Sequence, residues 1–492
     1  MTKYFLLLLL PLMGFAQKQS LDKQLFEAYD DFREVSLDTR RFKHQDIQPL
    51  IDSLKEEKGF EITVLGRSIQ GRNISMISVG EGETQILLWS QMHGDESTAT
   101  SSVFDMINYL KTDKTILKNV KVHFIPMLNP DGAALFTRRN AIGIDINRDA
   151  LRLQSPESQI LKKVRDSLDA DFGFNLHDQS KYYNAVQTSK PATISFLAPA
   201  FNVEKDINQT RGNAMRVIGK MNGILQRYAR GQVGRYSDEF EPRAFGDNMQ
   251  KWGTSTILIE SGGHFEDPEK QFIRKLNYVG ILSAIEMIGT ESYQTTGLDK
   301  YLSIPKNDRK LFDLKIENLS FSYLGLDFIV DLGINQHEIE NKTHSDFYYL
   351  GKISDIGDLS THYGYETLDA AGFTFKVGET YPKILNDFEE FMSLDFLSLL
   401  TQGYTSVSIN GVPKEIKFTP MPMNIIDIKK IMVPKNNTLP ASPINLGTDA
   451  TFLLSKNDQV VYAVINGFVY YLKENKNNSS TLVDKVNKRL LI

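Results

Sequence analysis

Short apolar runs alternate with longer amphipathic segments along the first 290 residues. A buried strand produces an apolar run, whereas apolar positions that recur every three or four residues predict a helix. The strands predicted in this way are 86–89, 120–128, 172–176 and 256–259, and the helices are 97–110, 155–168, 214–228 and 273–288. The runs 62–65 and 74–79, with glycines between them, predict a hairpin. This alternation indicates an α/β fold with a mixed central sheet and helices on both faces.

The pattern changes after about residue 293, where short alternating runs dominate. A helical interruption is predicted near 384–400, a hairpin at 405–411, and two strands joined by an Asn-Gly turn within 460–471. A chain of 492 residues is also too long for one compact core. We therefore expect an α/β domain at 17–292 and a mainly β domain at 293–492.

The first residues follow a different pattern. Lys3 precedes an apolar run that ends in Gly14-Phe15-Ala16, which predicts a secretory signal peptide over 1–16. The run is shorter than the ~20 apolar residues of a membrane-spanning helix. We therefore expect an exported protein, periplasmic or extracellular, with no membrane span after signal removal. Residues 17–60 are either a pro-segment or the first helices of the fold.

Composition narrows the chemistry. The net charge of −5 and the absence of a basic stripe argue against a nucleic-acid partner. The chain has no cysteine, which excludes disulfides, thiolate nucleophiles and cysteine-type zinc sites. Any metal must be held by His, Asp and Glu. Because structural zinc sites usually contain cysteine, such a set indicates a catalytic metal.

Four side chains suited to that chemistry follow predicted strands. His93 and Glu96 come after 86–89, His177 directly follows 172–176, and Glu260 directly follows 256–259. In open α/β sheets, ligands bind at the carboxyl ends of strands. Zinc accepts imidazole and carboxylate ligands together. The four positions therefore predict a metal site at one edge of the sheet.

An arginine- and asparagine-rich segment, 137–148, provides a second candidate feature. Planar guanidinium groups bind carboxylates through paired hydrogen bonds. The segment is either a solvated surface or a site that holds a substrate carboxylate.

Five motifs carry a resemblance to a known family. They are HGDE at 93–96, NPDG at 129–132, RRNAIGIDINR at 138–148, NLH at 175–177 and ILIES at 257–261. In their order and spacing, over about residues 62–288, the chain resembles the zinc metallocarboxypeptidases of the carboxypeptidase A type (the funnelin family). The resemblance implies one zinc ion per chain and a peptide substrate with a free C-terminal carboxylate.

The resemblance also assigns the reacting groups. His93, Glu96 and His177 would be the zinc ligands, and Glu260 the general base. Arg138 would polarise the scissile carbonyl and hold the developing negative charge.

Further positions would bind the substrate or support a ligand. Asn147 and Arg148 match the clamp for the terminal carboxylate, and Asp145 matches the carboxylate that orients His93. The family also has a tyrosine before the base strand. Within the polar, glycine-rich segment 231–247, Tyr236 is the nearest candidate, although phenylalanines also lie there.

The residue that sets side-chain preference is expected in the same segment. If Asp247 is the family's aspartate, Gly246 occupies the specificity position, and no acidic group marks a preference for basic side chains. Four charged residues nearby could alter this: Arg235, Glu239, Glu241 and Arg243. Outside this segment, Asp178 either supports the neighbouring His177 or lies at the surface, and we expect the surface. We also expect His123 inside the sheet and His264 as a packing residue.

The second half carries a weaker resemblance. Segments 353–359, 369–372 and 446–451 are similar to the small β-sandwich that flanks the barrel of amidohydrolases. The metal-binding HxH of that barrel is missing, so we expect an accessory module and no second active site. An unrelated β domain is an equally open interpretation.

Three functions compete. The leading prediction is a secreted zinc-dependent metallocarboxypeptidase that removes C-terminal residues from peptides through a zinc-activated water and Glu260. The alternative is a zinc-dependent amidase acting on acyl-amino acids or cell-wall peptides. A non-catalytic binding protein is disfavoured, because every ligand and base position is filled.

Overall fold

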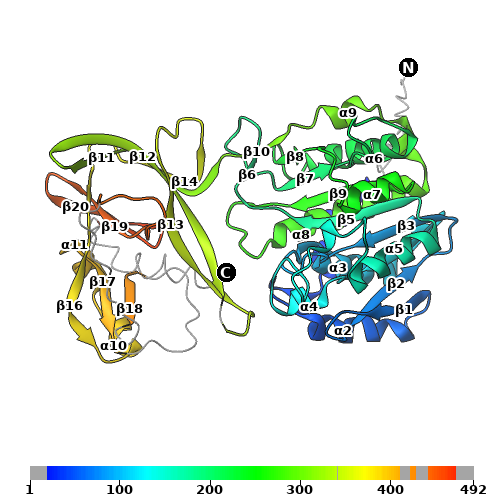
Figure 1. Cartoon of the computed structure of the whole chain (residues 1–492), viewed down its shortest axis with the longest axis horizontal. Coiled ribbons are helices and arrows are strands. Elements are labelled where there is room, and N and C mark those ends of the chain that lie inside the picture. The colour runs from blue at the N-terminus through cyan, green and yellow to red at the C-terminus, as the bar shows by residue number, and fades with distance from the viewer. Residues whose placement is uncertain (1–18, 341, 411–421, 428–441, 473–492) are drawn as a thin grey trace, which may run out of the picture.

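The computed structural model describes residues 19–340, 342–410, 422–427 and 442–472. The predicted signal peptide, 1–16, lies outside the described residues. Two lobes follow one another along the chain, an α/β lobe and a β-rich lobe (Figure 1). Within the described part, no helix combines the length and apolarity that a membrane crossing requires.

A mixed sheet forms the centre of the α/β lobe. Its described strands are β1 (Phe60–Arg67), β2 (Asn73–Val79), β3 (Thr84–Trp89), β4 (Val120–Ile125), β5 (Phe172–Asp178), β7 (Ile194–Leu197), β8 (Val233–Arg235) and β9 (Ser255–Ser261). They lie in the order β1-β2-β4-β3-β5-β9-β7-β8. The central strands β4, β3, β5 and β9 are parallel, so their carboxyl ends meet at one edge. The predicted hairpin is confirmed as the antiparallel pair β1–β2.

Helices cover both faces of this sheet. They are α1 (Leu21–Glu27), α2 (His44–Ser53), α3 (Thr98–Thr112), α4 (Pro130–Ala134), α5 (Pro156–Leu168), α6 (Gln209–Leu225), α7 (Phe245–Lys251), α8 (Gln271–Gly289) and α9 (Asp299–Leu302). Short 3-10 turns lie between them: η1 (Tyr29–Asp31), η2 (Val35–Leu37), η3 (Leu54–Glu56), η4 (Thr115–Leu117), η5 (Ile146–Arg148) and η6 (Ser292–Thr295). The predicted fold class is thereby confirmed.

Strand alternation explains the two cores. In β3, Ile86 and Leu88 belong to the core beneath α3, α6 and α8, while Leu87 and Trp89 belong to the core beneath α5 and α7. Successive strand side chains point to opposite faces, so an uninterrupted apolar run is what a doubly covered strand requires.

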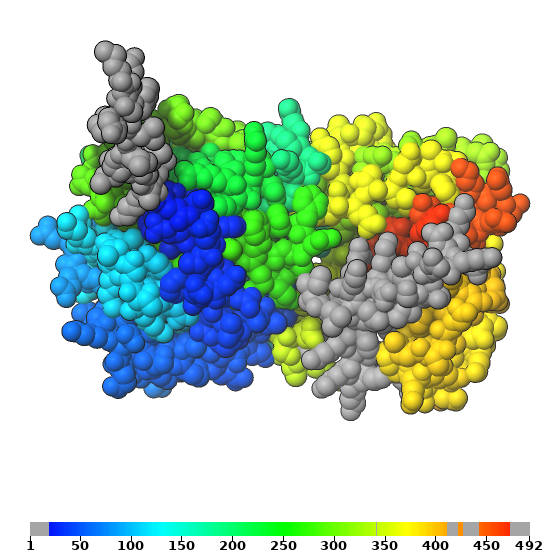
Figure 2. Space-filling model, turned by 180° about the vertical axis from the view of Figure 1, so that it is seen from behind, coloured from blue at the N-terminus to red at the C-terminus, as the bar shows by residue number. Residues whose placement is uncertain are grey.

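The segment before the sheet is part of this packing. Leu25, Tyr29 and Ile47 are almost fully buried in the first core, and the N-terminal elements, coloured blue, lie across the α/β lobe (Figure 2). Of the two alternatives for residues 17–60, this favours the first helices of the fold. The same core extends past residue 292 to Tyr301 and Ile304. The domain boundaries themselves stay a prediction.

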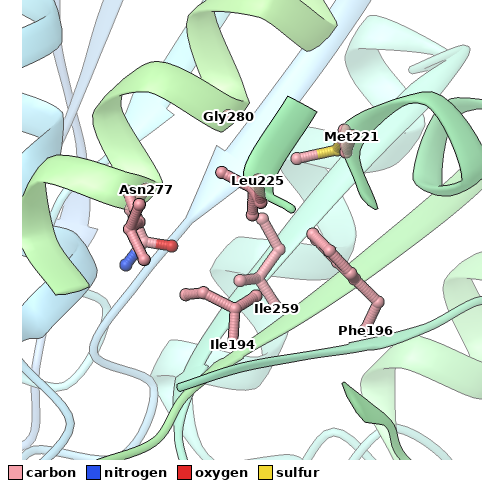
Figure 3. A pocket seen from close by; sticks show the side chains of 8 residues that line it. Ile194, Phe196, Met221, Leu225, Ile259, Asn277 and Gly280 are labelled. Carbon is pink, nitrogen blue, oxygen red and sulfur yellow. The ribbon is translucent and has the colours of Figure 1, made fainter. Parts of the chain in front are cut away.

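An apolar gap lies between the sheet and helices α6 and α8 (Figure 3). Its walls come from β7, β9, α6 and α8: Ile194, Phe196, Met221, Leu225, Ile259, Leu276, Asn277 and Gly280. Asn277 is the polar side chain in this lining, and it donates to Ser261 Oγ at 2.8 Å. A ligand site needs several convergent polar groups. We therefore interpret this gap as part of the core.

The β-rich lobe begins after a short link in which β10 (Asn307–Arg309) pairs with β6 (Tyr183–Ala185). Its larger sheet contains β11 (Leu311–Tyr323), β12 (Leu326–Glu340), β13 (Phe347–Gly357), β14 (Tyr363–Asp369), β15 (Thr374–Lys376), β19 (Phe452–Lys456), β20 (Gln459–Ile465) and β21 (Phe468–Tyr471). A smaller sheet contains β16 (Glu379–Leu385), β17 (Tyr404–Ile409) and β18 (Asn424–Asp427), with α10 (Phe388–Met392) and α11 (Phe396–Thr401) between β16 and β17.

Two predictions for this lobe have different outcomes. The Asn-Gly hairpin is confirmed: β20 pairs with β21, and Asn466 and Gly467 have φ of 53° and 80°, as a type I′ turn requires. The hairpin predicted at 405–411 is wrong, because β17 pairs in parallel with β16 and β18. Alternation identifies a strand but carries no information about its partner.

Candidate metal and catalytic site

Two imidazoles and one carboxylate converge at the carboxyl edge of the sheet. His93 Nδ1 lies 2.8 Å from Glu96 Oε1, and His177 Nδ1 lies 2.7 Å from Glu96 Oε2. The ligand atoms of all three residues lie within 4.8 Å of one another. His93 and His177 are almost fully buried. The structure therefore brings the three predicted ligands together.

The chemistry of this donor set fits zinc. Two ring nitrogens and one carboxylate, with no thiolate, are the ligands of catalytic zinc sites that leave a coordination position open. Burial alone would lower the pKa of His93, but the charge of Glu96 and the hydrogen bonds to Asp145 and Glu96 outweigh it and raise that pKa to about 9. The carboxylates thus stabilise positive charge at this place, and a divalent cation would satisfy the same groups.

Close packing of two loops positions the first two ligands. A Cβ at Gly94 would lie 2.1 Å from the carbonyl carbon of Gly132, so the two backbones touch. Asn129 joins the loops through its side-chain Nδ2, which donates to the Met92 carbonyl at 3.3 Å. The NPDG motif thus opens helix α4, with Asn129 as its N-cap, and holds the loop that carries His93.

Asp145 and Arg138 surround His93 on its other side. Asp145 Oδ1 lies 3.1 Å from His93 Nε2 and Asp145 Oδ2 accepts from Arg138 Nε at 3.0 Å. Arg138 Nη1 also donates to Glu96 Oε1 at 3.3 Å. A carboxylate behind a ligating histidine fixes its tautomer and orientation. The structure thus places Asp145 and Arg138 beside His93, and their roles stay predictions.

Glu260 lies beside His177 on the neighbouring strand. The two residues are register partners in the parallel pair β5–β9. Burial raises the pKa of the Glu260 carboxyl well above its usual range, and the charge of Glu96 raises it further. No side chain among the described residues forms a hydrogen bond to this carboxyl group. A carboxyl with a raised pKa and no fixed partner is suited to proton transfer.

Both residues of the predicted carboxylate clamp have partners within the protein. Asn147 Oδ1 accepts from the Phe245 backbone N–H at 2.9 Å, so its side chain supports helix α7. Arg148 is exposed at the end of η5 and has an ion pair with Glu241, with 3.4 Å between Arg148 Nε and Glu241 Oε2. Glu241, which sequence reasoning left unplaced, therefore lies at the clamp.

Tyr236 also lies near the reacting groups. Its hydroxyl is 3.5 Å from that of Tyr183. Burial raises its pKa, as do the Tyr183 hydroxyl and the charge of Glu260. Of the two phenylalanines in the segment 231–247, Phe245 is fully buried in the core and Phe240 is half-buried.

The predicted specificity position, Gly246, lies next to a buried side-chain amide. A Cβ at Gly246 would lie 3.3 Å from Asn175 Nδ2. Asn175 is fully buried, and neither polar atom of its side chain has a hydrogen-bond partner among the described residues. No role for the Asn175 side chain is predicted from the sequence.

One surface prediction is wrong. The Asp178 side chain is buried, and its Oδ2 accepts from Thr98 Oγ1 at 2.6 Å and from Lys270 Nζ at 3.0 Å. Its backbone N–H donates to Glu96 Oε2 at 3.1 Å. Lys270 comes from the start of α8, far along the chain, so nothing in the local pattern around Asp178 could have revealed the pair. His123 and His264 pack as expected, with His264 against Phe272.

Comparisons with known proteins agree with these motifs. Residues 47–195 match the family described as zinc carboxypeptidase. Carboxypeptidase SOL1 of Arabidopsis thaliana is 28% identical over 175 residues, which cover 28% of this chain and 35% of that protein. An uncharacterised protein of Zymomonas mobilis is 26% identical over 144 residues, which cover 27% of this chain and 37% of that protein. The chain thus spans little more than a third of the length of these curated relatives.

Among solved structures, a metallo-carboxypeptidase from Pseudomonas aeruginosa in complex with (2-guanidinoethylmercapto)succinic acid is 18% identical. The match covers 50% of this chain and 69% of that chain, with a TM-score of 0.42. The β-rich lobe lies outside the matched family segment, and its likeness to an amidohydrolase sandwich stays a prediction. On this match, residues 47–195 of the chain resemble the zinc carboxypeptidase family.

Proposed function

We propose that this protein is a zinc-dependent metallocarboxypeptidase that releases C-terminal residues from peptides. The observation that carries the proposal is the convergence of His93 Nδ1 and His177 Nδ1 on the carboxylate of Glu96, with Glu260 on the adjacent strand. Packing alone does not require three potential metal ligands to lie beside a carboxyl group that forms no side-chain hydrogen bond among the described residues.

The residues divide the reaction between them. A zinc ion held by His93, Glu96 and His177 would act as a Lewis acid and lower the pKa of a water molecule towards ~7. Glu260 takes the proton from that water and passes it to the departing amine. Arg138, beside the ligands, stabilises the negative charge that develops on the scissile carbonyl oxygen.

Recognition of the chain end would limit cleavage to the last peptide bond. Arg148 presents an exposed guanidinium group within the same loop as Asn147 and Asp145, and guanidinium groups pair well with a carboxylate. Tyr236, which lies near Glu260, would contact the same peptide. A peptide without a free terminal carboxylate loses this contact.

Export is part of the proposal. The pattern of 1–16 supports a signal peptide, and a chain without cysteine folds without disulfides in an oxidising compartment. Expression in a bacterial host, followed by N-terminal sequencing of the mature protein, tests cleavage after Ala16. A chain that keeps its first residues would contradict this part of the proposal.

The central prediction concerns Glu260. We expect Glu260→Gln to keep one zinc ion per chain, because the ligands are untouched, and to lower kcat/KM roughly 10²–10⁴-fold, because the base is lost. Metal analysis and peptide hydrolysis measure the two effects. Glu239→Gln, an exposed glutamate that pairs with Lys205 away from the site, is the matched control. Full activity of Glu260→Gln would show that Glu260 is not the base.

A second comparison separates exopeptidase from amidase activity. Peptides with a free C-terminus should be hydrolysed, and the same peptides with a C-terminal amide should resist cleavage. Equal cleavage of both would reject the carboxypeptidase and leave the amidase.

A further inference from the structure

The carboxylate clamp already faces a carboxylate of the protein itself. Arg148 Nε and Glu241 Oε2 lie 3.4 Å apart, and their side chains are 37% and 31% exposed. Arg148 Nη1 is turned towards the Asn147 carbonyl, which it reaches at 2.8 Å. The Arg148 guanidinium group, which we expect to bind the substrate's terminal carboxylate, is therefore already paired with the carboxylate of Glu241.

Backbone contacts hold this arrangement in place. The Ala150 N–H donates to the Arg243 carbonyl at 3.1 Å, which joins the segment after Arg148 to the turn that carries Glu241. The Glu241 N–H donates to Asp247 Oδ1 at 3.0 Å. Because Asn147 also caps the chain at Phe245, the two segments are docked on each other. The proximity of Glu241 and Arg148 is thus built into the loop.

Glu241 has a second cationic partner, Arg243. Glu241 Oε1 accepts from Arg243 Nε at 3.1 Å, and Glu241 Oε2 accepts from Arg243 Nη2 at 3.0 Å, a bidentate arrangement. Hydrogen bonds from Arg243, together with the charge of Arg148, lower the pKa of Glu241. Glu241 is therefore an anion shared between a clamp residue and an exposed arginine.

We propose that Glu241 is the resting counter-ion of Arg148 and competes with the substrate's terminal carboxylate, and that Arg243 holds Glu241 when the substrate displaces it. This inference rests on the proposed function. Ligands that offer only a carboxylate must replace an existing ion pair. Peptides that make further contacts gain enough to displace Glu241, so the pair selects against small free acids.

The two neighbours predict opposite effects. Glu241→Gln removes the competitor, so the KM for peptides with a free C-terminus and the Kd of a carboxylate ligand should fall about two- to fivefold, the range of a partly exposed ion pair. Arg243→Gln leaves Glu241 with Arg148 alone, so both constants should rise by a similar factor. The double variant should resemble Glu241→Gln, because Arg243 acts through Glu241. In each case kcat should stay within about twofold.

Equilibrium binding to the zinc-loaded, full-length protein tests this without turnover. The probes are the tightest binder from a panel of N-acetyl amino acids and its C-terminal amide, measured by calorimetry. The amide should bind all variants alike, since it makes no ion pair with Arg148. Glu239→Gln is the matched control, because this exposed glutamate lies on the same segment and pairs with Lys205.

The outcomes separate the two proposals. Opposite shifts for Glu241→Gln and Arg243→Gln, confined to the acid, support the inference. Shifts in the same direction, or none, would overturn it while the proposed function stands. Equal binding of acid and amide by the unaltered protein would reject the proposed clamp and the inference with it.

Discussion

Buried histidines in this chain have two different environments, and the environment decides what each can do. His93 and His177 face carboxylates, which favour positive charge at the site. His123, in β4, instead lies between two neutral groups: its Nδ1 is 2.7 Å from Ser78 Oγ, and its Nε2 is 2.9 Å from Gln85 Oε1. Burial and the charge of Lys121 lower the pKa of His123 to about 4. A neutral imidazole in the sheet cannot accept a proton without cost.

This makes stability depend on pH through His123. The unfolded chain binds the proton near pH ~6.5, whereas the folded chain binds it near pH 4. The contribution of His123 is therefore complete above pH ~6.5 and is lost as the pH falls towards 4. Over this pH range, His123 lowers the free energy of unfolding by roughly 3 kcal/mol. We expect His123→Gln to lose less stability than the unaltered protein between pH 7 and 4.5.

Urea unfolding at both pH values measures the difference. The substitution also removes ring packing, so the quantity to compare is the change with pH and not the absolute stability. His337→Gln is the control, since this histidine of β12 is exposed. Identical pH dependence in His123→Gln and the unaltered protein would contradict the prediction.

At the scale of elements, the site depends on two loops that touch through glycines. Gly94 lies between the ligands His93 and Glu96, and it meets Gly132 at the start of α4 with no room for a side chain. Any atom added there must push the loops apart, and with them the two ligands. The short motifs HGDE and NPDG thus act as one structural unit.

We expect Gly94→Ala to lower both zinc affinity and stability. Overpacking of a rigid contact typically costs about 1–3 kcal/mol, and displaced ligands bind the ion less tightly. Chelator competition measures zinc affinity, and thermal unfolding measures stability. Gly223→Ala in α6, where no atom lies within 4 Å of the added Cβ, is the control and should be neutral or slightly stabilising. Unchanged zinc affinity in Gly94→Ala would show that the loops can separate without consequence.

At the scale of the whole molecule, the β-rich lobe contacts the loops that carry the site. Ser97, next to Glu96, donates to the Arg40 carbonyl at 2.6 Å, and Arg40 pairs with Glu338 of β12 at 2.5 Å. Farther along, Lys181 follows His177 and pairs with Asp313 of β11 at 2.6 Å. Figure 1 shows the β12–β13 hairpin alongside the α/β lobe. These contacts join the β-rich lobe to the segments next to the site.

Glu338 is the centre of this interface, because it pairs with Arg40 and also with Arg41, whose side chain is 2% exposed. Glu338→Gln should lower the free energy of unfolding by roughly 2–3 kcal/mol, since it leaves buried arginines short of a counter-charge. Asp449→Asn breaks an exposed pair with Lys352 within the β-rich lobe and should cost at most about 1 kcal/mol. Denaturant unfolding of both variants measures the difference. Equal small losses would mean that the interface contributes little.

Much of the site could be predicted because its chemistry is local. His93, Glu96, His177 and Glu260 each follow a strand whose apolar run is visible in the sequence, and parallel strands bring such ends to one edge. The residues that were missed or misplaced have partners far along the chain. Asp178 pairs with Lys270, and the parallel pairing of β17 could not be inferred from its alternation.

The sequence by itself determined the fold class, the strand-end positions of the proposed ligands and base, and the chemistry open to a chain without cysteine. Those properties follow from residue type and periodicity, which act over a few neighbours. Only the tertiary structure decided that Glu241 faces Arg148, that Asp178 is buried beside Glu96, and that the β-rich lobe supports the site loops. These three contacts depend on which distant segments pack together. The sequence pattern gives no information about the distance between charged groups that come together only on folding.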